Sequence, residues 1–323
     1  MRRHFLLSLA AAALVAANAA PAWAQLEQPI KIVFPYSAGG IGDALARLLG
    51  ENLRAGLNGQ SVVVENVTGA AGRTGVRTVI NAAPDGKTIL LSPIAAVAVH
   101  NHVYKNLGYD PLTDLAPISQ VAEFEFGIAV GPNVPAKTLD ELVKWAKANP
   151  DKASYGSPGA GALPHFFGVL FGKAAGIDLV HIGYKGSASA LTDLVGGQIP
   201  IVVTTTSDLL AQHKAGKIRI LATSDSKRSP LVPEVPTFKE SGYDIVGTSW
   251  YAVFAPAKTP ADIREKYSKI LAAAVKRPEI KEKFLTMGLY ATGTTPEELG
   301  KIQKQDSAHW APAVKASGFS PNQ

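Results

Sequence analysis

Strand-like and helix-like segments alternate along the chain, and this alternation restricts the folds that the sequence can adopt. Apolar, strand-like runs occur at residues 30–35, 61–67, 87–92, 178–184, 199–204 and 218–223. Helix-like segments occur at residues 43–54, 72–82, 260–276, 279–287 and 296–316, and a capping-box pattern at Thr138 opens another. Strands separated by helices form right-handed βαβ units. The sequence therefore predicts an α/β fold with mainly parallel sheets.

Two further segments alternate like strands and lack helix signals, and we interpret them as crossings between two lobes. A chain that leaves one α/β lobe, builds a second and returns encloses a cleft, as in proteins that close on a ligand. We expect lobe I to comprise residues 25–126 and 247–323, and lobe II residues 127–246. The hinge strands are expected near residues 121–130 and 245–255.

The first 24 residues (1–24) carry the features of a cleavable export signal. Arg2 and Arg3 precede an apolar run at residues 5–17, and a small-x-small cleavage pattern ends at Ala24. The run is shorter than the roughly 20 apolar residues that span a bilayer. Arg2 and Arg3 also fit a twin-arginine signal, so both the Sec and the Tat route stay open. We expect a soluble protein of the bacterial periplasm.

Charge and composition indicate a small anionic partner. The chain has no cysteine, and its formal net charge of +6 falls to +4 without Arg2 and Arg3. The basic residues are scattered rather than gathered in a patch, which fits a small anion better than nucleic acid. We expect a monomer that has no cofactor and does not bind nucleic acid.

No set of residues indicates catalysis or metal binding. His100 and His102 form the only close histidine pair, no acid or cysteine completes a metal site, and we expect a surface or turn pair. No Ser-His-Asp set is present, so neither catalytic nor metal-ligating residues are expected. Trp250 and Tyr251 lie in a crossing strand, where the core is favoured over the cleft.

Three turns with small residues start helices in a way that suits a bound anion. The glycines of residues 35–49 lack the spacing of a P-loop or a dinucleotide-binding turn. Free backbone N–H groups at a helix N-terminus favour a small carboxylate, and a tight turn capped by Asp43 explains the pattern equally well. The other two turns are at residues 155–165 and 184–187, where Lys185 meets an anion or remains a solvated surface lysine. Together the three turns predict a ligand with two acidic ends.

The chain resembles, nearly end to end, the substrate-binding proteins of tripartite tricarboxylate transporters, also called Bug proteins. The resemblance rests on seven stretches in order: PIKIVFPYSAGGIGDALARLL, VVVENVTGAAGRTG, APDGKTILL, YDPLTDLAPIS, YKGSASALTDLVGGQI, KAGKIRILATSDSKRSP and EVPTFKESGY. It implies a type II periplasmic-binding-protein fold, a Venus flytrap whose two lobes close on a carboxylate. It also implies delivery to a permease with one large and one small membrane subunit, driven by an ion gradient. In the family, backbone N–H groups and waters at the first glycine turn hold a ligand carboxylate.

Three departures from the family pattern point to an apolar ligand. Ile94, Ala95, Ala96 and Val97 replace a polar loop, and Ala162 and Leu163 replace hydroxyl residues beside the retained His165. Thr204 replaces an aspartate that can pair with a ligand amine, which leaves no carboxylate there. Unpaired polar groups of a ligand would cost about 1–3 kcal/mol each, which disfavours citrate-like compounds and amino acids. We predict a dicarboxylate with an apolar or aromatic body, terephthalate- or phthalate-like first and adipate-like next, with neutral drift in these loops as the alternative.

The expected ligand-binding residues gather in five regions of the sequence. The first region is expected to hold one carboxylate, with Asp43 closing the motif. The second region and Leu163 contact the ligand body. The helix starts near Ser157 and Gly186, helped by the hydroxyls of Thr204 and Thr205, meet the far carboxylate. They are Tyr36, Ser37, Ala38, Gly39, Gly40, Ile41 and Asp43; Ile94, Ala95, Ala96 and Val97; Ser157, Gly159, Gly161, Ala162, Leu163 and His165; Lys185 and Gly186; and Thr204 and Thr205. Two other functions use the same fold: a ligand sensor that docks on a membrane kinase and, less favoured, a periplasmic enzyme.

Overall fold

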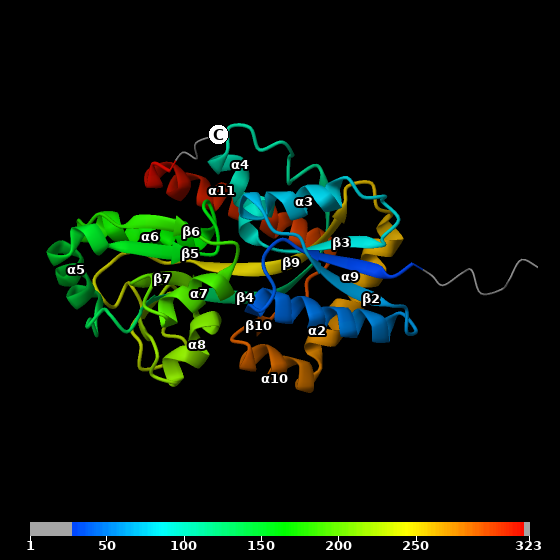
Figure 1. Ribbon diagram of the computed structural model, residues 1–323. Helices are drawn as coiled ribbons and strands as arrows, with labels where there is room; N and C mark the ends of the chain where they lie inside the picture. Colours follow the sequence, from blue (N-terminus) through cyan, green and yellow to red (C-terminus); the bar gives the residue numbers. More distant parts are fainter. Residues whose placement is uncertain (1–27, 320–323) are drawn as a thin grey trace, which may run out of the picture.

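A single mixed β-sheet runs through the molecule and is flanked by helices at both ends (Figure 1). The computed structural model describes residues 28–319, so the expected signal at 1–24 lies outside the described residues. The strands are β1 (Ile30–Phe34), β2 (Val62–Asn66), β3 (Thr88–Pro93), β4 (Leu115–Val130), β5 (Ser154–Ser157), β6 (Val180–Gly183), β7 (Ile201–Thr205), β8 (Arg219–Thr223), β9 (Thr248–Pro256) and β10 (Tyr290–Ala291). The helices are α2 (Ile41–Gly56), α3 (Arg73–Ile80), α4 (His100–Val103), α5 (Leu139–Ala148), α6 (Leu163–Ala175), α7 (Ser187–Val195), α8 (Thr206–Lys214), α9 (Ala261–Lys276), α10 (Pro278–Thr286) and α11 (Pro296–Ser317), with short turns η1 (Ala70–Gly72), η2 (Ala95–Val99) and η3 (Pro150–Lys152).

The sheet divides into two halves that share strand β4. The main strand order is β2-β1-β3-β9-β4-β7-β5-β6, and β8 and β10 also pair with β4. In Figure 1, β2 and β3 lie on the right with α2, α3 and α9, whereas β5, β6 and β7 lie on the left with α5 to α8. We call these groups the first half and the second half. Each predicted strand run and helix-like segment forms an element of the predicted type, because each is a local apolar pattern bounded by turn residues.

Within each half the outer strands are parallel, as predicted, but the strands that join the halves are antiparallel. β1 pairs in parallel with β2 and β3, and β5 pairs in parallel with β6 and β7. β9 runs antiparallel to β3 and β4, and β4 runs antiparallel to β7 and β8. The sheet is therefore mixed rather than mainly parallel, because a chain that crosses to the second half and returns must do so in opposite directions.

β4 changes its partner in mid-strand. Its residues from Leu115 to Glu125 pair with β9, whereas those from Phe126 to Val130 pair with β7 and β8. This change falls beside the expected boundary between residues 126 and 127. The assignment of the chain to two lobes with these bounds stays a prediction.

Side-chain caps start several helices where the sequence indicates. Thr138 accepts a hydrogen bond from the N–H of Glu141 at the start of α5, as its pattern predicts. Thr295 and Glu298 form a complete capping box at the start of α11. Capping satisfies backbone donors that the first helical turn leaves unpaired, which fixes where the helix begins.

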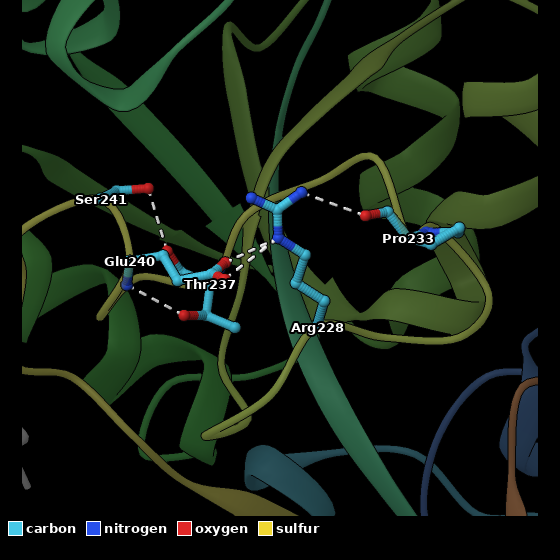
Figure 2. A network of polar contacts seen from close by, with 5 residues as sticks. All are labelled: Arg228, Pro233, Thr237, Glu240 and Ser241. Atoms are coloured by element: carbon cyan, nitrogen blue, oxygen red, sulfur yellow. Dashed lines mark hydrogen bonds and ion pairs between the residues drawn. The ribbon is translucent and has the colours of Figure 1, made fainter.

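The connection between β8 and β9, residues 224–247, contains little regular structure but is held by a polar network (Figure 2). The guanidinium group of Arg228 donates to both carboxylate oxygens of Glu240 and to the carbonyl of Pro233. Glu240 also accepts from the N–H of Thr237, whose hydroxyl accepts from the N–H of Glu240. Together with these backbone bonds, Arg228 holds the pKa of Glu240 below its usual range.

One hydrophobic cluster extends from the first half to the second. It includes Ile32 and Leu49 in the first half, Phe254 in β9, and Phe166 and Phe171 in α6. A smaller cluster lies under α7 and α8 in the second half. Among the described residues, no helix is long and apolar enough to cross a membrane.

Candidate functional site

A cavity lies where the two halves of the sheet meet. It has about 550 Å³ of empty space, part of which opens to solvent. Its lining comes from β1, β3, β4, β7 and β9, from the loops that follow them, and from four helix starts. The lining residues are Phe34, Tyr36, Ser37, Gly40, Gly42, Pro93, Ile94, Ala95, Phe124, Phe126, Pro158, Ala162, Leu163, Pro164, Ser187, Thr204, Thr205, Asp208, Ser249 and Tyr251.

One wall of the cavity is aromatic, and we call it the aromatic wall: Phe34, Tyr36, Phe124, Phe126 and Tyr251. The ring of Tyr251 stacks on Phe124 with centroids 4.6 Å apart, and Phe126 meets Phe124 edge-on at 5.5 Å. Phe34 lies 5.7 Å from Tyr36 and 6.4 Å from Tyr251. Burial, with a smaller effect of the Asp208 carboxylate, raises the pKa of Tyr251 well above its ordinary value, so its hydroxyl stays protonated. Such a wall favours apolar or aromatic ligand surface.

Much of the remaining lining lies at helix N-termini, and we call this part the helix-start wall. Gly40 precedes α2, Ala162 precedes α6, Ser187 begins α7 and Thr205 precedes α8, and all four residues line the cavity. The N-terminus of a helix carries partial positive charge and unpaired N–H groups, which stabilise anions. Among the described residues that line the cavity, Asp208 is the one member of the Asp, Glu, Lys and Arg types. The positive potential therefore comes from backbone rather than from lysine or arginine.

Asp208 is the functional candidate that sequence reasoning missed. Its Oδ1 accepts a hydrogen bond from the N–H of Ile41 at 3.0 Å, at the start of α2 in the first half. Its Oδ2 accepts from the hydroxyls of Thr204 at 3.2 Å and Thr205 at 2.7 Å. The prediction that no carboxylate is available beside Thr204 is therefore wrong, because Asp208, one helical turn later, reaches that place. The spacing Thr205-x-x-Asp208, typical of a helix start, was the available signal.

The first glycine turn is fastened at several points. The N–H of Gly39 donates to Asp43, which also accepts from Arg47 and Asn66. Burial raises the pKa of Asp43, but these hydrogen bonds outweigh it and hold the pKa below its ordinary value. The N–H of Ser37 donates to the carbonyl of Lys185 in the second half at 3.0 Å. Asp43 thus shapes the turn from behind rather than facing the cavity.

The expected site residues divide into those that line the cavity and those that do not. The former are Tyr36, Ser37, Gly40, Ile94, Ala95, Ala162, Leu163, Thr204 and Thr205. Gly159 and Lys185 instead line an adjoining surface cleft. Outside the lining of both lie Ala38, Gly39, Ile41, Asp43, Ala96, Val97, Ser157, Gly161, His165 and Gly186. Their direct contact with a ligand stays a prediction.

Physical reasons explain several of the residues that lie away from the cavity. Ala96 and Val97 are fully buried, and their carbonyls accept from Tyr109 and Gln303. The hydroxyl of Ser157 donates to the carbonyl of Gly159 and is engaged inside the second half. Gly186 approaches Ser37 so closely that a Cβ on it would lie 2.2 Å from the Ser37 hydroxyl oxygen. This glycine permits the two halves to touch.

His165 is a packing residue rather than a cavity residue. Its ring stacks on His181 with centroids 3.9 Å apart, and its Nδ1 accepts from the N–H of Gly161. Burial and the neighbouring His181 lower the pKa of His165 to about 3, and burial lowers that of His181 to about 4. Both rings are neutral at physiological pH, because a charged imidazole would be poorly solvated there.

The histidine pair at His100 and His102 differs from expectation. His100 is fully buried at the start of α4, and burial together with Arg73 lowers its pKa to about 3. Only His102 lies on the surface, where its Nε2 is 2.9 Å from the hydroxyl of Ser307 in α11. Local sequence did not indicate this burial, because Arg73 and Gly161, which act on the His100 ring, are distant in the chain. Within the described residues, no group of three or more potential ligands could hold a metal ion.

The adjoining surface cleft shares Tyr36 and Pro158 with the cavity and is more polar. It is lined on one side by η1 and Arg73, and on the other by Gly159 and Lys185. The guanidinium carbon of Arg73 lies 3.8 Å from the centroid of the Tyr104 ring, a cation–π contact. The basic residues nearest the cavity are therefore at this outer cleft.

A two-part α/β fold around a cavity bordered by helix starts defines the class of periplasmic solute-binding proteins. The chain belongs to the tripartite tricarboxylate transporter receptor family, also called the TctC or Bug family, whose model matches residues 45–319. It is 32% identical over 316 residues to the protein BugT of Bordetella pertussis, covering 97% of this chain and 95% of BugT. The family is one of solute-binding receptors, and its members are periplasmic.

Solved structures agree with this assignment. The structure of the periplasmic binding protein BugD is 35% identical, with a TM-score of 0.87, over 92% of this chain and 99% of BugD. The structure of R. palustris Rpa4515 with adipate is 28% identical, also with a TM-score of 0.87, over 93% of this chain and 100% of that one. The predicted family and the predicted fold class are thus confirmed.

Proposed function

We propose that this protein captures a small carboxylate with an apolar or aromatic body and delivers it to the two membrane subunits of a tripartite tricarboxylate-type permease. The observation that carries the proposal is the pairing of two unlike walls around one cavity. The aromatic wall is buried, and the helix-start wall offers backbone N–H groups without a basic side chain. The first suits a hydrocarbon body, and the second suits a carboxylate.

The cavity disfavours polyols and hydroxylated tricarboxylates. Apolar side chains line it at Ile94, Ala95 and Leu163, where a ligand hydroxyl would have no partner. An unpaired buried polar group costs about 1–3 kcal/mol, so each additional hydroxyl lowers affinity. The relative whose structure contains adipate supports a ligand with an apolar middle. Terephthalate-, phthalate- and adipate-like diacids, as predicted from the sequence, and their monoacid counterparts form the class to test.

A thermal-shift screen of the mature protein tests the ligand class. Aromatic and aliphatic mono- and diacids should raise Tm, whereas citrate and glutamate should not. A ligand at 100 times its Kd adds about 2.7 kcal/mol of stability, which is readily measured. A clear shift with citrate or glutamate, and none with the apolar acids, would contradict the proposal.

A pair of variants tests whether a ligand-induced shift in Tm arises from binding at this cavity. Leu163 lines the cavity, whereas Leu285 is 51% exposed on α10. Leu163→Gln should abolish the ligand-induced shift, measured from the variant's own unliganded Tm, because an amide replaces apolar surface that the ligand body would contact. Leu285→Gln should retain the full shift. Equal shifts in the two variants would place the ligand elsewhere.

Uptake of a radiolabelled ligand tests delivery to a permease. A strain that lacks the gene should lose high-affinity uptake, and the wild-type gene should restore it. The Leu163→Gln gene should not restore uptake, and the Leu285→Gln gene should. Unchanged uptake in the deletion strain, together with lost induction of genes for the ligand's metabolism, would contradict delivery.

A further inference from the structure

The carboxylate of Asp208 occupies a helix N-terminus that belongs to the other half of the molecule. Asp208 lies in the first turn of α8, yet its Oδ1 accepts from the N–H of Ile41 in the first turn of α2, 167 residues away in the chain. A helix N-terminus such as that of α2 favours a small anion. In this chain a protein carboxylate already binds there.

Ordinary helix capping does not explain this contact. Three helices share the same pattern, a threonine N-cap followed three residues later by an acid: Glu141 in α5, Asp208 in α8 and Glu298 in α11. Glu141 and Glu298 reach back to backbone N–H groups at their own helix starts, at Lys137 and Thr295. Asp208 instead points across the cavity, held by Thr204 and Thr205.

We infer that Asp208 is a resident carboxylate that sets the charge of the solute. Because its carboxylate already takes the N–H of Ile41 at the start of α2, a solute carboxylate is favoured at the other helix starts of the cavity, those of α6 and α7. A second solute carboxylate beside Thr204 and Thr205 would lie against Asp208, and like charges at such separation repel. The preferred solute is therefore a monocarboxylate with an apolar or aromatic body. This choice within the ligand class rests on the proposed function.

Two unpaired hydroxyls of the cavity agree with a solute that carries hydrogen-bond acceptors. Among the described residues, the hydroxyls of Ser37 and Ser249 are buried without a hydrogen-bond partner, and both residues line the cavity. Ser249 is only 2% exposed. Buried hydroxyls without partners are unfavourable, so a solute that supplies acceptors would satisfy them. Asp208, by contrast, already accepts three hydrogen bonds and needs no cation.

The same contact joins the two halves of the molecule through protein groups alone. The Ile41–Asp208 bond and the Ser37–Lys185 backbone bond both join the first half to the second across the cavity. A bound carboxylate in other binding proteins provides such a bridge from outside the chain, whereas Asp208 provides it from within. The ligand-free protein should therefore be more closed than a variant that lacks this carboxylate.

Matched acid pairs measured by calorimetry test the specificity. Wild-type protein should bind 4-methylbenzoate at least about tenfold more tightly than terephthalate, and hexanoate more tightly than adipate, because of like-charge repulsion. Asp208→Asn keeps an oxygen that can accept from Ile41 but removes the charge, so it should improve diacid affinity by about tenfold and change monoacid affinity much less. Diacids that bind wild type as tightly as monoacids, or an equal loss for both in Asp208→Asn, would overturn the inference.

Small-angle X-ray scattering of the ligand-free protein tests the bridge and needs no ligand. Asp208→Ala should increase the radius of gyration relative to wild type. Glu298→Ala, which removes the equivalent acid of α11 far from the cavity, should not. Circular dichroism confirms that each variant is folded. An unchanged radius in Asp208→Ala would overturn the bridge. If none of the acids binds wild type, the proposed function fails while this measurement still decides the role of Asp208.

Discussion

The two walls of the cavity are built by different physical means. The aromatic wall consists of side chains on β1, β4, β9 and the loop after β1, packed ring against ring at centroid distances between 4.6 and 6.4 Å. The helix-start wall consists of backbone at the beginnings of α2, α6, α7 and α8. Packing fixes the shape of the first wall, and dipoles fix the charge preference of the second. Separate elements therefore select the shape and the charge of the ligand, so a mutation can alter one preference without the other.

The largest effect should follow from breaking the aromatic wall. Tyr251→Ala removes a ring that is 6% exposed and stacks on Phe124, and should lower the free energy of unfolding by about 3–5 kcal/mol. It should also weaken aromatic acids more than aliphatic ones. Urea unfolding and calorimetry measure the two effects. Tyr251→Phe keeps the ring and is the control. A similar loss in both variants would show that the hydroxyl, not the ring, matters.

Acid should destabilise the folded protein through two buried histidines, His165 and His181. His165 and His181 have pKa values of about 3 and 4 in the folded protein against 6.5 ordinarily, so the unfolded chain binds more protons below pH 6.5. Their contribution to stability is complete above pH 6.5 and is lost as pH falls towards 4, with a slope of roughly 3 kcal/mol per pH unit for two protons. Urea unfolding at several pH values measures it. His181→Gln should reduce the slope, and the exposed His309→Gln should not. A pH-independent stability between 6.5 and 4.5 would contradict this.

A methyl group added at Gly42 in α2 should disturb the contact between this helix and Phe34 of the aromatic wall. A Cβ on Gly42 would lie 2.3 Å from Cζ of Phe34, so Gly42→Ala should cost about 1–3 kcal/mol and reduce ligand affinity. Gly50→Ala on the same helix is the control, because its nearest neighbour, Val62, is at 3.4 Å. It should stabilise the protein by up to about 1 kcal/mol, through helix propensity. Thermal unfolding compares the stability of the two variants. Equal stabilities would mean that the Phe34 ring moves aside at little energetic cost.

The smallest effect should come from Ser249. Its hydroxyl is buried without a partner among the described residues, so Ser249→Ala should leave the ligand-free stability unchanged or raise it by about 1 kcal/mol or less. Ligand affinity should fall if the solute pairs with this hydroxyl. Ser119→Ala is the control, because the hydroxyl of Ser119 donates to the carbonyl of Thr294 at 2.7 Å. Loss of this bond should destabilise the protein by about 1 kcal/mol. Destabilisation in both would mean that Ser249 has a partner.

The sequence predicts the aromatic wall less well than the helix-start wall. Helix starts are local events, marked by glycine at 40 and 186, by Ala162 before Pro164, and by Thr205, so their positions follow from nearby residues. The aromatic wall depends on register between strands far apart in sequence, and Tyr251, which was expected in the core, belongs to the hydrophobic cluster and also lines the cavity. The alternation of Phe124 and Phe126 in β4 places them on one face, but only pairing with β9 brings that face to the cavity.

Asp208 and His100 show the same limit in another form. Asp208 looks like a helix-capping acid, and nothing near it indicates that Ile41 lies opposite. His100 looks like a surface residue in its local sequence, yet it is fully buried in a region where Gln303 of α11 donates to the carbonyl of Val97. Both contacts join segments more than 160 residues apart. Local patterns determine which element forms, whereas distant partners determine what each side chain touches.

The hydrophobic cluster that passes from the first half to the second along β4 and β9 has a consequence for how the protein melts. Neither half has a main core of its own that the other could leave intact, since residues such as Phe124, Phe126 and Phe167 belong to the shared cluster. Heating should therefore give one calorimetric transition rather than two, with the calorimetric and van't Hoff enthalpies in agreement. Solute binding at the cavity would then delay unfolding of the entire molecule at once.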